Sequence, residues 1–370
     1  MISLVLLVVV ALLTLSILVT VHEFGHFVAA KLIGVWPEEF GIGLPPRVWG
    51  KKIGETIWSI NALPFGGFVR LHGETLDPHS PHSNRSFVGK SKLARAFVAL
   101  AGVSMNLIYA VLAFALIFFV LGVPHGVKVE TVNPDSPAAA IGLKQNDVIE
   151  SIDGRPLYNL SFFGMNVGKH AGKSISIDYK DAQTNETVHK QFVLRQFAPE
   201  GQGLLGISYN TEPAGYVEAK GLSKFFVSLQ YGAYQTYDFS VLILGEFGKM
   251  FTQIFTGHMP AGLTGPLGVV GVTAQAASQG ILDLINLTAL ISINLALINL
   301  VPFPPLDGSR VLFLIIEAFV GRKRLPAIEE RVQTIGMYLL LILVVFLTFR
   351  EVPKVFTSGS LEGFVQSLLK

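Results

Sequence analysis

Long apolar stretches dominate the hydrophobic pattern of this chain, and four of them have the length of a membrane-spanning helix. A helix needs about 20 predominantly apolar residues to cross a bilayer. The four stretches cover residues 2–30, 97–120, 281–301 and 335–349, and the last is short enough that its helix is expected to start earlier. A fifth stretch, residues 222–255, is rich in aromatic residues but carries four charges, which favours an amphipathic helix at the membrane interface. The pattern predicts a polytopic α-helical membrane protein with about four transmembrane helices.

The region between the first two apolar stretches predicts a β-loop, at residues 36–90. Its strands are expected at 56–62 and 67–71, and both are apolar and punctuated by glycine. Non-helical backbone is tolerated at membrane depth only where it is buried in protein or lines a cavity. A membrane-associated loop beside a watery site meets that condition, and its free edge could pair with an unwound peptide. An ordinary cytoplasmic hairpin fits the same residues, and the sequence leaves the two interpretations open.

A second β-rich region follows the second apolar stretch. Alternating apolar and polar residues predict strands at 127–132, 147–153, 174–179 and 187–194, and Asp153-Gly154 is a hairpin turn signal. This pattern resembles a PDZ domain, which captures extended peptides at a sheet edge. Residues 203–207, Gly-Leu-Leu-Gly-Ile, resemble the PDZ loop that binds a peptide carboxylate. The alternative is a small β-rich spacer without a ligand.

Composition agrees with a membrane protein and excludes several kinds of site. Of 370 residues, 51% are hydrophobic and 15% are charged, and the mean hydropathy is +0.53. The net charge of +2 gives no electrostatic case for a nucleic-acid partner. Cysteine is absent, which excludes disulfides and cysteine-ligated zinc, so any zinc ligands must be histidine and carboxylate. The N-terminus lacks a basic segment and a small-residue cleavage site, which indicates a retained first helix rather than a signal peptide.

Basic residues in the short connections predict the orientation. Residues 31–95 carry nine Lys or Arg against five Asp or Glu, and residues 310–331 carry five basic residues. Short basic connections lie on the cytoplasmic side. We therefore expect both termini and the PDZ-like region to be extracytoplasmic. The polar motifs described next then fall near the cytoplasmic ends of their helices.

The sequence His22-Glu23-Phe24-Gly25-His26 lies inside the first apolar stretch. Two histidines and a glutamate are costly within a spanning helix and mark a functional site. Positions i and i+4 share one helix face, so His22 and His26 can bind one zinc ion. Glu23 would then stand beside the activated water as a general base. A chance occurrence of the short pattern is the alternative, and the membrane context argues against it.

A third metal ligand is expected at Asp307. Zinc in hydrolases usually takes three protein ligands and a water, and two prolines break the helix just before this aspartate. Asp307 could instead cap the following helix, at residues 308–320. Asn294 and Asn299 lie on the preceding apolar helix, where they bind either the substrate backbone or a neighbouring helix.

Other polar residues have simpler interpretations. Gly102 and Asn106 favour close helix packing, with lining of the site from the second span as the alternative. His72, His79 and His82 lie in a polar stretch, and a solvated loop is favoured there over a second metal site.

The predicted domains are residues 1–122, 123–215, 216–275 (an amphipathic, interfacial linker) and 276–370.

Taken together, these motifs resemble the site-2 protease family, and within it the bacterial regulator-of-sigma-E protease group. The resemblance rests on HEFGH, on Leu-Pro-Phe-Gly-Gly-Phe-Val at residues 63–69, on the PDZ-like region and on Asn-Leu-Val-Pro-Phe-Pro-Pro-Leu-Asp-Gly at 299–308. It covers nearly the whole chain. The chain departs from relatives that have two PDZ-like domains, which puts substrate filtering in doubt, and it reads Asp-Gly-Ser-Arg where Asp-Gly-Gly is usual.

The resemblance implies an intramembrane zinc metalloprotease of the bacterial inner membrane. It implies one Zn²⁺ per chain, held by His22, His26 and Asp307, with Glu23 as base. It further implies that the β-loop with Gly66 and Gly67, and the helix with the two asparagines, hold an extended substrate. The expected substrates are single-span proteins such as anti-sigma factors, or signal-peptide remnants, and a peptide C-terminus is a further candidate partner at the PDZ-like domain.

Two other functions fit parts of the pattern. A membrane-anchored PDZ scaffold with a structural zinc site predicts a closed shell of four ligands and no cleavage. A zinc transporter needs ionisable residues along several spans, but here they cluster near one end. Neither alternative accounts for a glutamate beside two histidine ligands.

Overall fold

The computed structural model describes most of the chain. The described residues are 4–74, 83–257, 264–321, 325–358 and 360–368. They form two compact units, which we call the helical unit (residues 1–114 and 236–370) and the β unit (residues 115–235). The β unit is wider than the predicted PDZ-like domain because it includes the end of one long helix and the start of another.

Among the described residues, four helices are long and apolar enough to cross a membrane, as the sequence predicts. They are α1 (Leu4–Leu32), α2 (Lys92–Leu121), α7 (Ile281–Leu300) and α9 (Leu325–Thr357). The last one begins well before residue 335, which the shortness of its apolar stretch had indicated. Residues 222–255 fall within a single helix, α5 (Gly221–Phe255), which is not among the four candidate spans. Its interfacial position stays a prediction.

Three shorter helices complete the helical unit as described. They are α6 (Pro266–Gln279), α8 (Asp307–Val320) and α10 (Leu361–Leu368), and a 3-10 turn covers Ser83–Arg85. The predicted helix break before Asp307 is confirmed, because α7 ends at Leu300 and α8 begins at Asp307. The buried carboxylate of Glu351 on α9 accepts the backbone N–H groups of Gly265 and Gly268, at 2.6 and 3.1 Å. This side chain caps the start of α6, where backbone donors have no partner within the helix.

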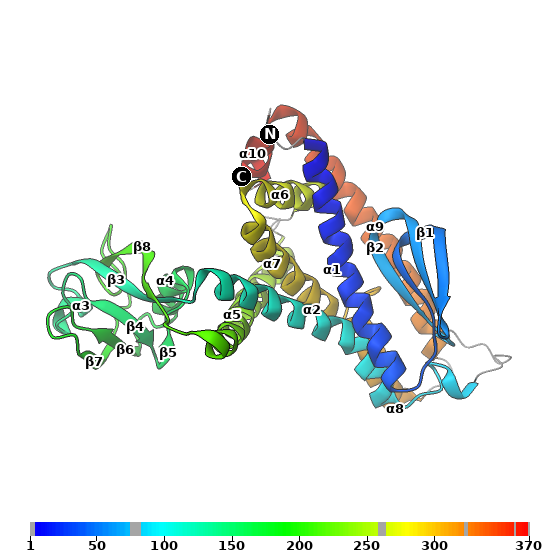
Figure 1. The fold of residues 1–370 in the computed structure, drawn as a ribbon, viewed down its shortest axis with the longest axis horizontal. Helices are drawn as coiled ribbons and strands as arrows, with labels where there is room; N and C mark the ends of the chain where they lie inside the picture. The colour runs from blue at the N-terminus through cyan, green and yellow to red at the C-terminus, as the bar shows by residue number, and fades with distance from the viewer. Residues whose placement is uncertain (1–3, 75–82, 258–263, 322–324, 359, 369–370) are drawn as a thin grey trace. The chain divides into compact units, whose positions relative to one another are not determined.

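A sheet of two long strands, β1 (Pro37–Ile53) and β2 (Thr56–Leu71), lies beside α1 (Figure 1). The two predicted strands at 56–62 and 67–71 are parts of the single strand β2. Phe40 pairs with both Trp58 and Val69, so the first part of β1 lies between the two halves of β2. The second half of β2 is therefore at an outer edge of this sheet.

The expectation of a solvated loop at His72 is wrong. The residue is only 7% exposed, its Nδ1 lies 2.7 Å from a carboxylate oxygen of Glu38, and its ring contacts Trp36. The residue follows the end of β2 directly, so the strand carries it into the packed interior. His79 and His82 lie outside the described residues.

The β unit contains a six-stranded sheet. Its elements are β3 (Pro124–Val132), α3 (Pro137–Ala140), β4 (Val148–Ile152), β5 (Arg155–Pro156), α4 (Leu160–Lys169), β6 (Ser174–Lys180), β7 (Thr187–Val193) and β8 (Ile207–Tyr216). The strand order is β7-β6-β4-β3-β8, with β5 paired to β4. The hairpin predicted at Asp153-Gly154 is confirmed by the pairing of Ile152 with Arg155. The core is apolar, and Val127, Ile149 and Ile177 are fully buried in it.

Candidate metal centre

The two histidines of HEFGH lie one turn apart on α1, and their rings point to one side. Their Nε2 atoms are 3.2 Å apart, and both side chains are buried. Gly25, between them, faces α2 so closely that a Cβ there would overlap the carbonyl oxygen of Ala101. A glycine at this position therefore lets the second helix pack directly against the face that carries the histidines.

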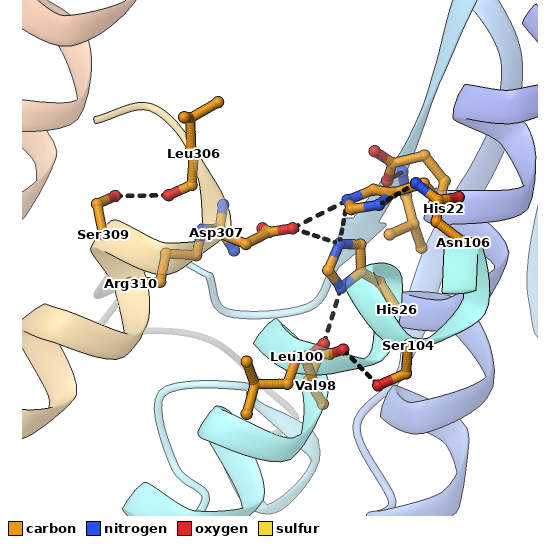
Figure 2. Close-up of polar contacts among 12 residues, drawn as sticks. His22, His26, Val98, Leu100, Ser104, Asn106, Leu306, Asp307, Ser309 and Arg310 are labelled. Atoms are coloured by element: carbon orange, nitrogen blue, oxygen red, sulfur yellow. Dashed lines mark hydrogen bonds and ion pairs between the residues drawn. The ribbon is translucent and has the colours of Figure 1, made fainter. Parts of the chain in front are cut away.

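Asp307 reaches the same point from the first turn of α8. Its Oδ2 lies 2.9 Å from Nε2 of His22 and 3.1 Å from Nε2 of His26 (Figure 2). The capping alternative has no support in this geometry, because Leu306 is the N-cap residue and the Asp307 carboxylate is directed at the histidines. The first residue of α8 thus carries the side chain that contacts both imidazoles.

These three side chains fit a zinc ion. Tetrahedral zinc with bonds of about 2.0–2.1 Å holds its ligand atoms about 3.3 Å apart. The three atoms are 2.9 to 3.2 Å apart here, so only a small outward shift separates them from that geometry. Two histidines and one carboxylate also match the three-ligand donor sets of catalytic zinc sites, which leave a fourth position open.

Helix α2 supplies the outer partners of both histidines. Nδ1 of His26 lies 2.8 Å from the carbonyl oxygen of Val98, and Nδ1 of His22 lies 3.2 Å from the amide Nδ2 of Asn106 (Figure 2). Between them, a Cβ on Gly102 would stand 2.6 Å from ring atoms of both histidines. Sequence analysis favoured close helix packing for Gly102 and Asn106 and gave lining of the site as the alternative. In the structure both residues lie against the histidines.

Glu23 lines a cavity of about 240 Å³ next to the cluster. The same cavity is lined by His22, Asp307 and Asn299, and by Val19, Leu295, Pro305 and Leu306. Oε2 of Glu23 accepts a hydrogen bond of 3.1 Å from the backbone N–H of Val69, on the outer half of β2. The carboxylate is therefore oriented by the sheet and stands between the sheet edge and the cavity.

The remaining predicted site residues lie at different distances from this cavity. The carbonyl of Gly66 accepts a hydrogen bond from the hydroxyl of Ser16, and a Cβ on Gly67 would contact Thr20, so both glycines run along α1 before HEFGH. Asn299 lines the cavity. Asn294 is exposed, and its amide donates to the carbonyl of Leu290 on its own helix, so it is not brought to the cavity.

Sequence reasoning missed the contacts that hold α8 in place. The guanidinium of Arg95, at the start of α2, donates to both carboxylate oxygens of Glu317 on α8 at 2.7 Å, and both side chains are less than 10% exposed. Arg310 forms a second ion pair, with Glu74 after β2, at 2.9 Å. The only signal in the sequence is that Glu317 interrupts an otherwise apolar stretch.

Comparison with known proteins places these residues in a family. The model of peptidase family M50 matches residues 10–343. The chain is 33% identical over 345 residues to a protein of Clostridium perfringens provisionally named zinc metalloprotease CPE1693, with 92% of this chain and 97% of that protein covered. It is 27% identical over 423 residues to the regulator of sigma-W protease RasP of Bacillus subtilis, with 92% and 96% covered.

A solved structure also matches part of the chain. It is the PDZ domain of the SdrC-like protein of Listeria monocytogenes, which is 27% identical to the matched residues. The match covers 23% of this chain and 87% of that one, with a TM-score of 0.21.

Proposed function

This chain belongs to peptidase family M50 and is a zinc metalloprotease of the membrane, and from that premise we propose that it cleaves peptide bonds inside membrane-spanning segments. One observation carries the proposal. His22, Glu23 and Asp307 line one cavity, the second histidine, His26, lies 3.2 Å from His22, and three of these four side chains come from the candidate spanning helix α1. Such residues are expensive within apolar helices unless they serve chemistry.

His22, His26 and Asp307 are the proposed ligands of one zinc ion per chain. When bound, the zinc would supply a water activated for attack near neutral pH and would polarise the scissile carbonyl. Three ligands beside a cavity suit a catalytic site better than a structural one, which is closed by four protein ligands. This arrangement favours the protease over the membrane-anchored scaffold.

Glu23 is the proposed general base. It lies next to His22 in the chain and faces the same cavity, so its carboxylate can take a proton from the attacking water. The same carboxylate then carries the proton to the leaving amine nitrogen. The N–H of Val69 holds Oε2, which leaves the other carboxylate oxygen for proton transfer.

The substrate is proposed to lie extended between the sheet edge and α7. A helical segment hides its backbone groups in i to i−4 hydrogen bonds, so it must unwind before cleavage. The outer half of β2, with Gly66 and Gly67, runs along α1 toward Glu23 and can pair with an unwound strand. Asn299, which lines the cavity, is the proposed amide contact to the substrate backbone, and Asn294 is not.

The proposed substrates are single-span proteins such as anti-sigma factors, or signal-peptide remnants. The charge pattern supports an extracytoplasmic β unit and an active site near the cytoplasmic face. In the β unit, the loop at residues 203–206 leads directly into β8, at the end of the strand order. Arg195 donates to the carbonyl of Leu204, so its guanidinium lies beside this loop, and this cation supports a carboxylate site there. The same unit would exclude substrates with bulky outer domains.

The test is cleavage of a tagged single-span anti-sigma or signal-peptide substrate by the purified protein in detergent. Wild type is compared with Glu23→Gln, with Glu246→Gln as the matched control on the exposed face of α5, and each is run with and without a zinc chelator. We expect a cut within the apolar segment of the substrate. It should be lost in Glu23→Gln and with chelator, and retained in the control.

The zinc content of each variant separates the possible failures. Glu23→Gln should bind one zinc per chain although it does not cleave, because the base is not a ligand. Retained cleavage would refute the base assignment. Zinc bound by the wild type without cleavage of either substrate would instead support the scaffold with a structural metal.

A further inference from the structure

Three positions of α2 face the two histidines of α1 in register. Val98, Gly102 and Asn106 are four residues apart, so they share one face of the helix. Val98 contacts His26, and Asn106 contacts His22. Gly102 lies between them, so close to both rings that neither can move toward α2. Helix α2 thus presents one polar atom to the Nδ1 of each histidine.

The direction of the rings dictates what those polar atoms must do. Both Nε2 atoms converge with the Asp307 carboxylate, so a metal held there takes each histidine through Nε2. A neutral imidazole that ligates through Nε2 carries its proton on Nδ1. Each Nδ1 then needs a hydrogen-bond acceptor. The carbonyl oxygen of Val98 is such an acceptor for His26.

For His22, the neighbouring atom is the amide NH₂ of Asn106, which is a donor. That orientation suits an imidazole whose Nε2–H donates to Asp307 and whose Nδ1 accepts. The amide oxygen of Asn106 is buried and has no hydrogen-bond partner among the described residues, and the side chain is 0% exposed. A half-turn of the amide exchanges its two ends and presents that oxygen to Nδ1 of His22.

The backbone of Asn106 is fixed, so only its amide group needs to turn. Its carbonyl oxygen accepts a hydrogen bond of 2.9 Å from the hydroxyl of Ser292 on α7, another buried residue. The side chain therefore stays opposite His22 in either orientation. A carboxamide can serve both proton positions of the imidazole, because it has a donor and an acceptor at nearly the same distance from its Cγ.

We propose that Asn106 is a positioning residue of the metal centre, whose Oδ1 accepts the Nδ1–H of His22 when the metal is bound. The inference rests on the proposed zinc site and adds a residue to it. Outer partners of this kind fix the proton position and the ring orientation of a ligating histidine, and their loss typically weakens metal binding by about 10–100-fold.

The test measures zinc affinity of the purified chain by competition with a chromophoric chelator. Asn106→Leu keeps the size but leaves Nδ1–H without an acceptor, and we expect its dissociation constant to rise by about 10–100-fold. Asn106→Asp restores an acceptor oxygen and should bind zinc as tightly as the wild type. Asn294→Leu, the same change on the exposed face of α7, should leave the affinity unchanged.

A purely structural role for Asn106 predicts a different pattern. Both Asn106 variants would then lower the unfolding temperature, while folded protein bound zinc with the wild-type constant, and this result would overturn the proposal. If Asn106→Leu does not fold, ¹⁵N spectra of histidine in the wild type decide. They should show the His22 proton on Nδ1 with zinc, in a hydrogen bond, and a free Nδ1–H would refute the assignment. Absence of zinc binding in the wild type would instead remove the proposed function itself.

Discussion

The helical unit and the β unit differ in the contacts that their buried polar groups make. In the β unit the core is apolar, and its buried carboxylate, Asp147, accepts backbone N–H groups of nearby loops at Lys144 and Ala182. In the helical unit, buried charged and polar side chains join helices that are far apart in the sequence, as Arg95 does with Glu317.

This difference bears on where the proposed chemistry takes place. Burying a charge costs free energy even when it is paired, and an apolar core of equal volume is often as stable. The β unit follows the cheaper solution. The helical unit instead buries polar side chains around His22, His26 and Asn106, although this costs free energy. Such burial is expected where groups must be held for chemistry rather than for stability.

Breaking the buried ion pair should have the largest effect on stability. Arg95→Leu removes the guanidinium that is paired with the buried carboxylate of Glu317, and such a loss costs about 3–5 kcal/mol. Because Glu317 and Asp307 share α8, zinc binding should weaken as well. Unfolding in denaturant and zinc titration of the detergent-solubilised chain measure the two effects.

Two controls show whether this cost comes from burial. Arg95→Leu with Glu317→Leu removes both charges and should recover most of the lost stability. Lys249→Leu breaks the exposed pair with Glu246, which is worth at most about 1 kcal/mol. If Arg95→Leu costs no more than Lys249→Leu, burial does not make the Arg95–Glu317 pair costly to break.

A single methyl group should disturb the metal centre next. In Gly102→Ala the new Cβ would stand 2.6 Å from ring atoms of His22 and His26, so the rings must move. A displacement of about 1 Å at a catalytic site can cost about 100-fold in rate. We expect peptide cleavage to fall by that order, and zinc affinity to fall with it.

Gly245→Ala on α5 is the matched control, because a Cβ there meets no atom within 4 Å. Alanine is a better helix former than glycine, so this variant should be as stable as the wild type or more so, with full activity. Wild-type zinc affinity and activity in Gly102→Ala would show that α2 does not press on the histidines as the structure indicates.

Local sequence patterns were enough to predict which side chains meet at the candidate metal centre. The i, i+4 spacing places His22 and His26 on one face whatever the rest of the chain does, and the prolines before Asp307 predict the helix break there. The long apolar stretches likewise predict the four candidate spans, because helix length and hydropathy are local properties.

Contacts between distant residues could not be predicted in this way. The pairing of Phe40 with both Trp58 and Val69 depends on how the two halves of β2 lie on either side of β1, whereas the sequence predicted two separate strands, at 56–62 and 67–71. The partnership of Asn106 with His22, and of Arg95 with Glu317, depends on which helices pack and at what height. Nothing in the spacing along one helix determines that.

The smallest expected effect is a pH-dependent one in the β unit. Hydrogen bonds from Ser151 and then His189 hold the pKa of the Asp178 carboxyl below its usual range. A carboxyl with a lowered pKa in the folded state stabilises that state above the unfolded pKa of about 3.9, and the stabilisation fades as the pH falls below it. Asp178→Asn should therefore unfold at a slightly lower temperature than the wild type at pH 7, with a smaller difference at pH 3.

Protease susceptibility of residues 115–235 on heating measures this, with Glu130→Gln as a control for the loss of one exposed charge. A difference that stays constant with pH would mean that the Asp178 contacts act through packing and not through charge.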